Sequence, residues 1–327
     1  MILLLVLFLN KINSTWLEKI AELKREFPNV RFENRMSVEK PRTLISESDI
    51  VVSGRMTHDE IMGAKKLKLI VVPFAGVNSL DWEAIRRKRV PVANCHANAA
   101  SVAERALALC LSLLGRVVEY DRDLRRGIWH GYSVGNKEED LWTSIRNKTI
   151  CIVGMGHIGE ELKKLLTPFG CRVIGVKRSA PAEKSEITSD LNWAIESSEV
   201  IFVTVPLTAS TKGMFNADLL MRMKGKYLIN ISRGEVIDES ALYFALKRGV
   251  LRGAAIDTWY LYPDSDHSVM LPSRFPFNTL SNIVLSPHVG GYCYEGISSL
   301  IEETVENIKS FLKSGKPLNL VNPQNEY

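Results

Sequence analysis

Residues 148–179 place three glycines between a short apolar strand and a helix, the order that a nucleotide-binding crossover requires. Gly154, Gly156 and Gly159 have G-x-G-x-x-G spacing, and a second apolar strand is predicted at 172–176. The first glycine makes a tight turn, the second lets a pyrophosphate approach the backbone, and the third lets the helix pack on the strand. Free N–H groups at the helix N-terminus favour the pyrophosphate. The segment therefore predicts dinucleotide binding.

The end of the second strand indicates which dinucleotide is bound. For NAD, an acidic side chain about 20 residues after the glycines accepts hydrogen bonds from the ribose 2′-OH. This sequence has no acid there and instead has Lys177, Arg178 and Ser179, whose two cations and hydroxyl suit the 2′-phosphate of NADP. We predict NADP(H), with NAD as the alternative if these residues form only a solvated strand end.

The length and composition are typical of a globular protein with two domains. A chain of 327 residues is too long for one ordinary core, and the hydrophobic and charged fractions, 46% and 24%, are those of soluble proteins. The net charge of +5 is spread along the sequence. It therefore favours a small anionic substrate over nucleic acid.

The cysteines and the apolar opening predict a cytoplasmic protein without a membrane anchor. Five cysteines without C-x-x-C spacing indicate reduced thiols, and they are Cys95, Cys110, Cys151, Cys171 and Cys293. The opening lacks the positive charge of a signal peptide, and its apolar run, residues 2–9, is too short to span a bilayer. We expect a buried first strand there.

Alternating strands and helices predict an α/β fold built on a doubly wound parallel sheet. Apolar strands are predicted at 50–53, 69–73, 200–205, 227–231, 254–256 and 283–285. A long helix is predicted from Ser101 to about Arg126, closed by Gly127. Because it is apolar nearly all round from 102 to 118, we expect it to be buried between domains or in a subunit interface.

Arg233 and His288 are the side chains best suited to chemistry on a carbonyl. Hydride transfer leaves charge on the carbonyl oxygen, so a nicotinamide enzyme needs one group to hold the substrate and another to move a proton. Arg233 follows the strand at 227–231, and its planar fork can hold a carboxylate with two hydrogen bonds. His288 follows the strand at 283–285, and imidazole titrates near neutral pH. The alternatives are an arginine in a surface turn and a structural histidine.

Seven ordered blocks of sequence resemble the D-isomer-specific 2-hydroxyacid dehydrogenases, and the similarity covers nearly the whole chain. The blocks are FAGVNSLD (74–81), VPVANCHANAASVAERALALCLSL (90–113), VGMGHIG (153–159), VPLTASTKGMFN (205–216), LINISRGEVIDESAL (228–242), GAAIDTW (253–259) and NIVLSPHVGG (282–291). The resemblance implies a doubly wound Rossmann domain inserted into a smaller flavodoxin-like domain, with the active site in the cleft between them. We expect a substrate (catalytic) domain at 1–97 and 292–327, and an NADP-binding Rossmann domain at 98–291.

The resemblance also implies roles for individual residues. Arg233 would bind the substrate carboxylate and carbonyl, and His288 would deliver a proton to the carbonyl oxygen. The backbone of Gly76 and Val77 would cradle the carboxylate, and Arg55 is a further candidate for substrate binding. The residues expected to bind the cofactor are Gly154, Gly156, His157, Ile158, Gly159, Lys177, Arg178, Ser179, Val205, Pro206, Thr211, Ile231, Arg233, Asp257 and His288.

One catalytic position departs from the family pattern. Asp257 would orient the nicotinamide amide, and the family usually places a Glu a few residues later, where it pairs with the histidine and raises its pKa. Tyr262 occupies that place here, and a Tyr can orient the imidazole but supplies no negative charge. Asp264 or Asp266 could substitute. If neither does, we expect the pKa of His288 to lie near its unperturbed value of about 6.5.

The leading hypothesis is an NADP(H)-dependent, D-specific oxidoreductase of small 2-oxo and 2-hydroxy acids, of the glyoxylate and hydroxypyruvate reductase type. Phosphoglycerate, D-lactate and formate dehydrogenases are alternatives within the same fold. From another class, a nucleotide-sensing protein like the family's corepressors is an alternative, although we see no long disordered extension to carry partner motifs. We expect a homodimer, as the family also implies, and no nucleic-acid, membrane or metal ligand.

Overall fold

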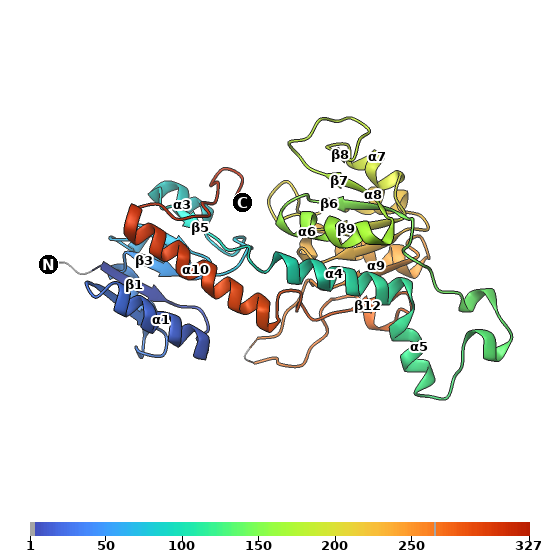
Figure 1. Ribbon diagram of the computed structural model, residues 1–327, viewed down its shortest axis with the longest axis horizontal. Helices are drawn as coiled ribbons and strands as arrows, with labels where there is room; N and C mark the ends of the chain where they lie inside the picture. Colours follow the sequence, from blue (N-terminus) through green and yellow to red (C-terminus); the bar gives the residue numbers. More distant parts are fainter. Residues whose placement is uncertain (1–3, 265) are drawn as a thin grey trace. The chain divides into compact units, whose positions relative to one another are not determined.

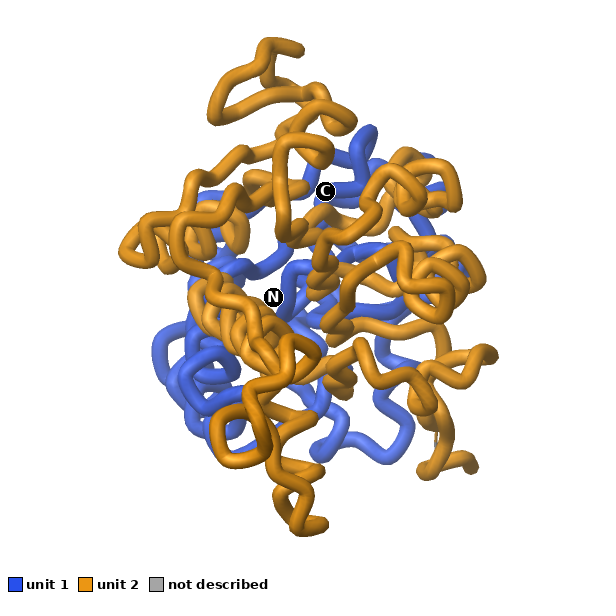
Figure 2. Tube along the Cα trace, turned by 90° about the vertical axis from the view of Figure 1, so that its right-hand side faces the viewer, with its two compact units in different colours: residues 1–98, 293–327 blue, residues 99–292 orange. Residues whose placement is uncertain are grey.

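The computed structural model describes residues 4–264 and 266–327, which form two compact units (Figures 1 and 2). Unit 1 combines the chain up to residue 98 with residues 293–327, and unit 2 is residues 99–292. The second unit is therefore inserted into the sequence of the first. Ile2 and Leu3 of the expected first strand lie outside the described residues.

Unit 1 is a parallel sheet with helices on both faces. Its strands are β1 (Leu4–Phe8), β2 (Val30–Asn34), β3 (Ile50–Val52), β4 (Leu69–Val71) and β5 (Val92–Ala93), in the order β2-β1-β3-β4-β5. Its helices are α1 (Ser14–Glu26), α2 (His58–Gly63), α3 (Trp82–Lys88) and α10 (Tyr294–Ser314). Side chains alternate along each strand, so Val6 and Phe8 pack with α1 and α10, and Leu7 packs on the opposite face with α2 and α3.

Unit 2 is a larger parallel sheet, also covered on both faces. Its strands are β6 (Thr149–Val153), β7 (Arg172–Val176), β8 (Ile187–Thr188), β9 (Val200–Val203), β10 (Tyr227–Asn230), β11 (Gly253–Ile256) and β12 (Ile283–Leu285). Their order in the sheet is β12-β11-β10-β9-β6-β7-β8. Helices α4 (Ala99–Leu114) and α6 (His157–Leu166) pack on one face, and α7 (Leu191–Glu196), α8 (Ala217–Arg222) and α9 (Glu239–Lys247) pack on the other. The predicted doubly wound α/β fold is confirmed.

The prediction of one long helix from 101 to 126 is wrong, because this segment forms two helices, α4 and α5 (Val117–Leu124). Arg116 has φ 52°, a left-handed conformation that a continuous helix does not contain. Helix α4 has eight buried residues, which confirms the expected burial for that part of the segment, whereas α5 has none within this chain, so its burial in a subunit interface stays a prediction. Val117 and Val118, which the apolar pattern included, are 56% and 52% exposed.

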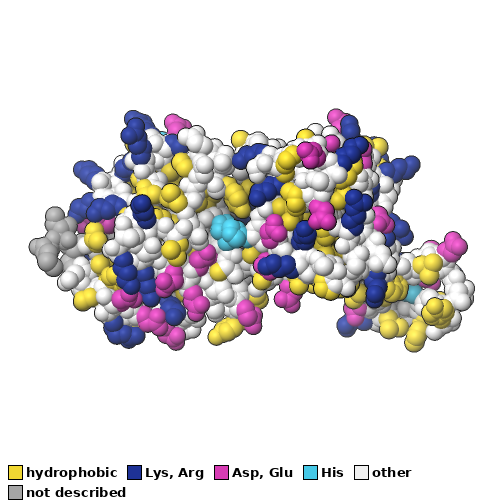
Figure 3. Space-filling model, turned by 45° about the horizontal axis from the view of Figure 1, so that its top comes forward, with side chains coloured by type: hydrophobic (Ala, Val, Ile, Leu, Met, Phe, Trp, Pro, Cys, Tyr) yellow, Lys and Arg dark blue, Asp and Glu magenta, His cyan; other side chains and the backbone are white. Residues whose placement is uncertain are grey.

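The described residues contain no membrane-spanning helix, no metal-binding cluster and no disulfide. No helix among them is long and apolar enough to cross a membrane. They also contain no group of three or more His, Cys, Asp or Glu side chains placed to hold a metal ion. All five cysteines are free. Figure 3 shows positive and negative side chains interspersed over the visible face, in keeping with a spread charge.

Candidate active site

Three neighbouring strands of unit 2 bring the expected catalytic residues to one edge of the sheet. Strands β10 and β11 are paired in parallel, as are β11 and β12, so their carboxyl ends lie side by side. Arg233 follows β10, Asp257 follows β11, and His288 follows β12. Ligands of open α/β sheets bind at such carboxyl ends. The strand order therefore brings together side chains from three separate parts of the sequence.

Asp257 holds the loop that carries His288. The carboxylate is 1% exposed and accepts hydrogen bonds from Ser286 Oγ at 2.5 Å, from Val289 N at 3.1 Å and from Gly290 N at 2.9 Å. These bonds straddle His288, whose φ of 57° is left-handed and costs a non-glycine residue about 1–2 kcal/mol. Both carboxylate oxygens thus hold the loop in a conformation it would not otherwise prefer. Orientation of the nicotinamide by Asp257 stays a prediction.

Tyr262 packs against the ring of His288. The two ring centroids are 5.5 Å apart with the planes tilted by 55°. The Tyr262 hydroxyl accepts a hydrogen bond from the backbone N–H of Trp259 at 3.0 Å, and the Trp259 indole N–H donates to Ser286 O at 2.8 Å. Tyr262 therefore contacts the imidazole through its ring, while its hydroxyl is held by the preceding turn.

Burial and the charge of Arg233 favour the neutral form of His288. Burial of one side lowers the pKa of His288, the positive charge of Arg233 lowers it further, and Asp257 opposes them in part. Burial also lowers the pKa of Arg233, which remains a cation because arginine does not deprotonate in proteins. The expected value near 6.5 is therefore too high. The sequence shows that a carboxylate is missing beside the imidazole but cannot show that a guanidinium lies near it.

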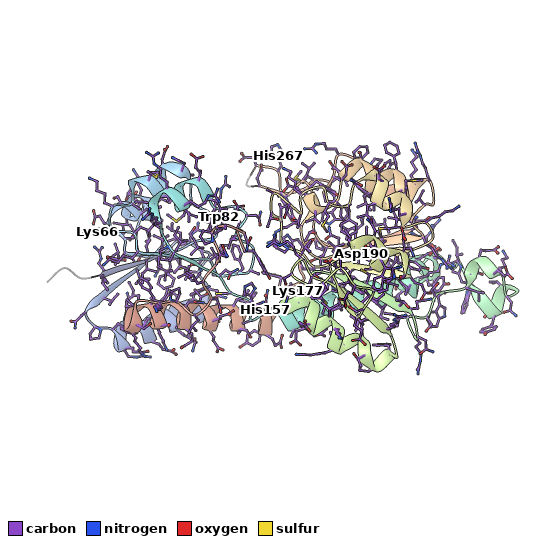
Figure 4. The ribbon with its side chains drawn as sticks, turned by 90° about the horizontal axis from the view of Figure 1, so that it is seen from above. Lys66, Trp82, His157, Lys177, Asp190 and His267 are labelled. Atoms are coloured by element: carbon purple, nitrogen blue, oxygen red, sulfur yellow. The ribbon has the colours of Figure 1, made fainter. Side chains whose placement is uncertain are left out.

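Asp264 does not replace the missing acid. Its Oδ1 accepts hydrogen bonds from Asp266 N at 2.9 Å and His267 N at 2.8 Å, and it lies 3.2 Å from the His267 ring. Figure 4 shows His267 at the margin of unit 2. Asp264 therefore stabilises the turn in which it lies and does not take the place of the missing Glu beside His288.

The glycine turn after β6 has no room for side chains. A Cβ on Gly154, whose φ is 114°, would lie 2.8 Å from both Thr204 Oγ1 and Val205 N. A Cβ on Gly159 would lie 2.3 Å from the Gly154 carbonyl oxygen. Gly156 is the N-cap of helix α6, which begins at His157. The turn and the helix N-terminus therefore form the cradle that a pyrophosphate requires.

The basic residues predicted to select NADP lie beside this cradle. Strands β6 and β7 are parallel neighbours, so the chain leaves β7 at the same edge as the glycine turn. Lys177, Arg178 and Ser179 are all exposed there. His157, at the start of α6, is exposed, and Ile158 is partly buried. Figure 4 shows His157 and Lys177 at this end of the sheet.

The remaining cofactor candidates follow the two central strands. Val205 and Pro206 come after β9, and Thr211 fixes this segment by donating from Oγ1 to the Pro206 carbonyl at 2.6 Å. Ile231 comes after β10 and is buried. Strand β9 lies between β6, which leads into the glycine turn, and β10, which leads into Ile231 and Arg233.

The substrate candidates of unit 1 lie at the carboxyl ends of β3 and β4, which are paired in parallel. Arg55 follows β3 and is exposed. Gly76 and Val77 follow β4, and the Val77 carbonyl accepts a hydrogen bond from the Trp82 indole at 3.2 Å. Figure 4 shows Trp82 in unit 1. The structure thus brings these three residues to one edge of the sheet of unit 1.

Sequence reasoning missed three residues that support the histidine loop, namely Arg105, Trp259 and Ser286. Arg105 Nη2 donates to Ser286 Oγ at 2.9 Å, and Ser286 also binds Asp257 and Trp259. One signal was present: Arg105 is a cation within the apolar stretch of α4. An arginine placed on such a helix needs a polar partner.

Comparisons with known proteins agree with this arrangement. Residues 107–290 match the model for the NAD binding domain of D-isomer specific 2-hydroxyacid dehydrogenase. A glyoxylate reductase of Thermococcus litoralis is 32% identical over 83% of this chain and 82% of its own length. A D-3-phosphoglycerate dehydrogenase of Methanocaldococcus jannaschii is 30% identical over 94% of this chain.

The curated phosphoglycerate dehydrogenases are longer than this chain, which spans 58%, 64% and 49% of three of them. Among solved structures, an NADPH-dependent glyoxylate/hydroxypyruvate reductase of Sinorhizobium meliloti, in complex with NADP and malonate, is 25% identical. It matches with a TM-score of 0.80 over 98% of each chain.

Proposed function

Because the chain belongs to the D-isomer specific 2-hydroxyacid dehydrogenases, we propose that it is an NADPH-dependent, D-specific reductase of small 2-oxo acids such as glyoxylate or hydroxypyruvate. The observation that carries this proposal is the position of Arg233 and His288 at the same carboxyl edge of the sheet that bears the glycine turn, after strands β10 and β12. Similarity to a glyoxylate reductase and to an NADPH-dependent reductase of glyoxylate and hydroxypyruvate supports the substrate class.

The residues around the glycine turn fit a dinucleotide phosphate. The turn packs tightly at Gly154 and Gly159, and helix α6 begins after Gly156 without a side-chain cap, so the N–H groups of its first turn can bind a pyrophosphate. Lys177 and Arg178 supply two cations where a 2′-phosphate would need them. When bound, NADPH supplies the hydride that reduces the substrate carbonyl.

Arg233 and His288 have different roles in the proposed reaction, namely substrate binding and proton transfer. The Arg233 guanidinium binds the substrate carboxylate and carbonyl through its two-pronged fork, which fixes the carbonyl carbon for attack. The protonated His288 gives its proton to the carbonyl oxygen as negative charge develops there, and it is left neutral. The lowered pKa makes the imidazolium a stronger acid, at the cost of a smaller protonated fraction at neutral pH.

We assign substrate binding to unit 1 and cofactor binding to unit 2. The turn after β4 carries Gly76, which is half-buried, and Val77, whose side chain is buried, and we propose that their backbone N–H groups bind a carboxylate. Arg55 adds a cation at the end of the neighbouring strand. Domain limits of 1–97 with 292–327 and of 98–291 remain our proposal.

We also propose a homodimer. The surface that supports it is the arm, residues 117–142, which leaves the sheet of unit 2 in Figure 1 and carries many hydrophobic side chains in Figure 3. Its most exposed large apolar residues are Val117, Val118, Leu124, Trp129, Tyr132, Leu141 and Trp142. Clustered exposed apolar side chains mark interaction surfaces. A monomeric mass by light scattering at all working concentrations would rule this assembly out.

Oxidation of phosphoglycerate is the second candidate, because several relatives at 30–32% identity are phosphoglycerate dehydrogenases. A panel of 2-oxo and 2-hydroxy acids, including glyoxylate, hydroxypyruvate, pyruvate, phosphoglycerate and formate, separates the candidates when each is assayed with both nicotinamide cofactors. The proposal predicts turnover of glyoxylate or hydroxypyruvate with NADPH preferred. Tight nucleotide binding without turnover of any acid would indicate a nucleotide-sensing protein instead.

A further inference from the structure

Arg105 is a charged residue on a helix that is largely buried in the core of unit 2. It lies in the middle of α4, where Val102, Ala103, Ala106 and Leu109 are buried in the core of unit 2. Its Nη2 donates to Ser286 Oγ at 2.9 Å, and its Nε is buried without a hydrogen-bond partner among the described residues. Leaving a buried donor of a charged group without a partner is costly, so the hydrogen bond to Ser286 is the one described contact that offsets this cost.

Ser286 links Arg105 to Asp257 through hydrogen bonds of its hydroxyl group. The Ser286 hydroxyl accepts from Arg105, which can only donate, so its own proton points to Asp257 Oδ1, 2.5 Å away. Its backbone is held as well, because Ser286 N donates to Ile256 O at 2.9 Å and Ser286 O accepts from Trp259 at 2.8 Å. Ser286 is 2% exposed, so water does not compete for these bonds.

Asp257 closes the chain of hydrogen bonds around His288. It binds the N–H groups of Val289 and Gly290, and a Cβ on Gly290 would lie 3.0 Å from its Oδ2. Residues on both sides of His288 are therefore tied to one carboxylate, which is how a left-handed φ at a non-glycine residue can persist.

We propose that Arg105 is a positioning residue for His288, acting through Ser286 and Asp257 in a site where Tyr262 replaces the carboxylate that would otherwise hold the imidazole directly. The proposal rests on the proposed function for its catalytic meaning. Arg105 itself touches the loop and not the reacting groups, and the imidazole is faced by Arg233 from the end of β10, Asp257 from the end of β11, and Tyr262.

The test compares Arg105→Met, which keeps length and removes charge and donors, with Arg105→Lys, which keeps the charge. Glu104→Gln, an exposed neighbour on the same helix, is the control. Arg105→Met should lower kcat for reduction by about tenfold or more, because a loop shift of about 1 Å can cost roughly 100-fold. The Kd for NADPH should stay within about twofold, and Arg105→Lys should recover part of kcat.

A second readout does not need turnover. The NMR titration of the His288 imidazole, assigned with His288→Gln, should move to higher pH in Arg105→Met, because a cation is lost near the loop and Asp257 is less neutralised. Ser286→Ala should produce the same shift, and the double variant should add little to either single variant.

An unmoved His288 titration together with an unchanged kcat would overturn the proposal. So would equal losses of kcat and NADPH binding with no shift in the titration, since that pattern indicates general damage to the fold. If the wild-type protein turns over no 2-oxo acid but the titration still moves, the proposed function fails and the positioning role of Arg105 stands.

Discussion

Substitution of the third glycine of the turn, Gly159→Ala, tests the cofactor cradle. The added Cβ would lie 2.3 Å from the carbonyl oxygen of Gly154, whereas ordinary van der Waals contact begins at 3.4 Å. The helix or the turn must therefore move by about 1 Å. The atom that the Cβ meets is backbone, so no side chain can rotate away to relieve the contact.

Overpacking of this kind costs about 1–3 kcal/mol. If the displacement falls on the turn that receives the pyrophosphate, the Kd for NADPH should rise roughly 5- to 150-fold. Titration of NADPH by calorimetry measures this, with thermal unfolding as a check on the fold. Gly63→Ala is the matched control, because a Cβ on this last residue of α2 would meet nothing within 4 Å. A folded Gly159→Ala variant that binds NADPH as tightly as wild type would refute the reasoning.

Three further changes test other parts of the site. Replacing Lys177 and Arg178 by Glu should lower the ratio of kcat/KM with NADPH to kcat/KM with NADH by about tenfold or more, since each substitution removes a charge-assisted hydrogen bond to the 2′-phosphate. An unchanged ratio in steady-state assays would show that Lys177 and Arg178 are surface residues that do not contact the cofactor. When the chemical step is rate-limiting, the rate of reduction should fall as pH rises through the lowered pKa of His288, because only the imidazolium can donate a proton. A rate that stays constant from about pH 6 to pH 9 would contradict this. Gly54→Ala would place a Cβ 2.0 Å from Phe74 Cζ, so the Phe74 ring must move away. The KM values across the substrate panel should then change, while the Kd for NADPH should not. KM values identical to those of wild type would show that this ring does not face the substrate.

The parallel sheet of unit 2 could be predicted because its central strands are buried on both faces and read as continuous apolar runs. The shortest strands, β5 and β8, have two residues each and leave no such run. The break between α4 and α5 was missed because the apolar pattern continues through Val117 and Val118, although both are exposed. Gly115 was the available signal, since a Cβ there would lie 2.7 Å from the Leu111 carbonyl oxygen.

The edge that holds Arg233 and His288 could be predicted because each follows a strand directly, and parallel strands end together. What the sequence could not give is which groups face the imidazole. Tyr262 packs by its ring, and Asp264 turns to its own loop. The pKa of His288 is lowered first by burial and then by the charge of Arg233, which is 55 residues away in the sequence, so spacing alone could not supply its direction.

A double-mutant cycle on Arg233→Ala and His288→Gln tests most directly whether these two residues act on one substrate. The measured quantity is kcat/KM for NADPH-dependent reduction of the preferred 2-oxo acid by wild type, both single variants and the double variant. If the guanidinium and the imidazole serve the same carbonyl, the double variant should lose little more than the worse single variant, because residues that act as a unit are strongly non-additive. Losses that multiply would show that the two residues act independently and would contradict the shared site.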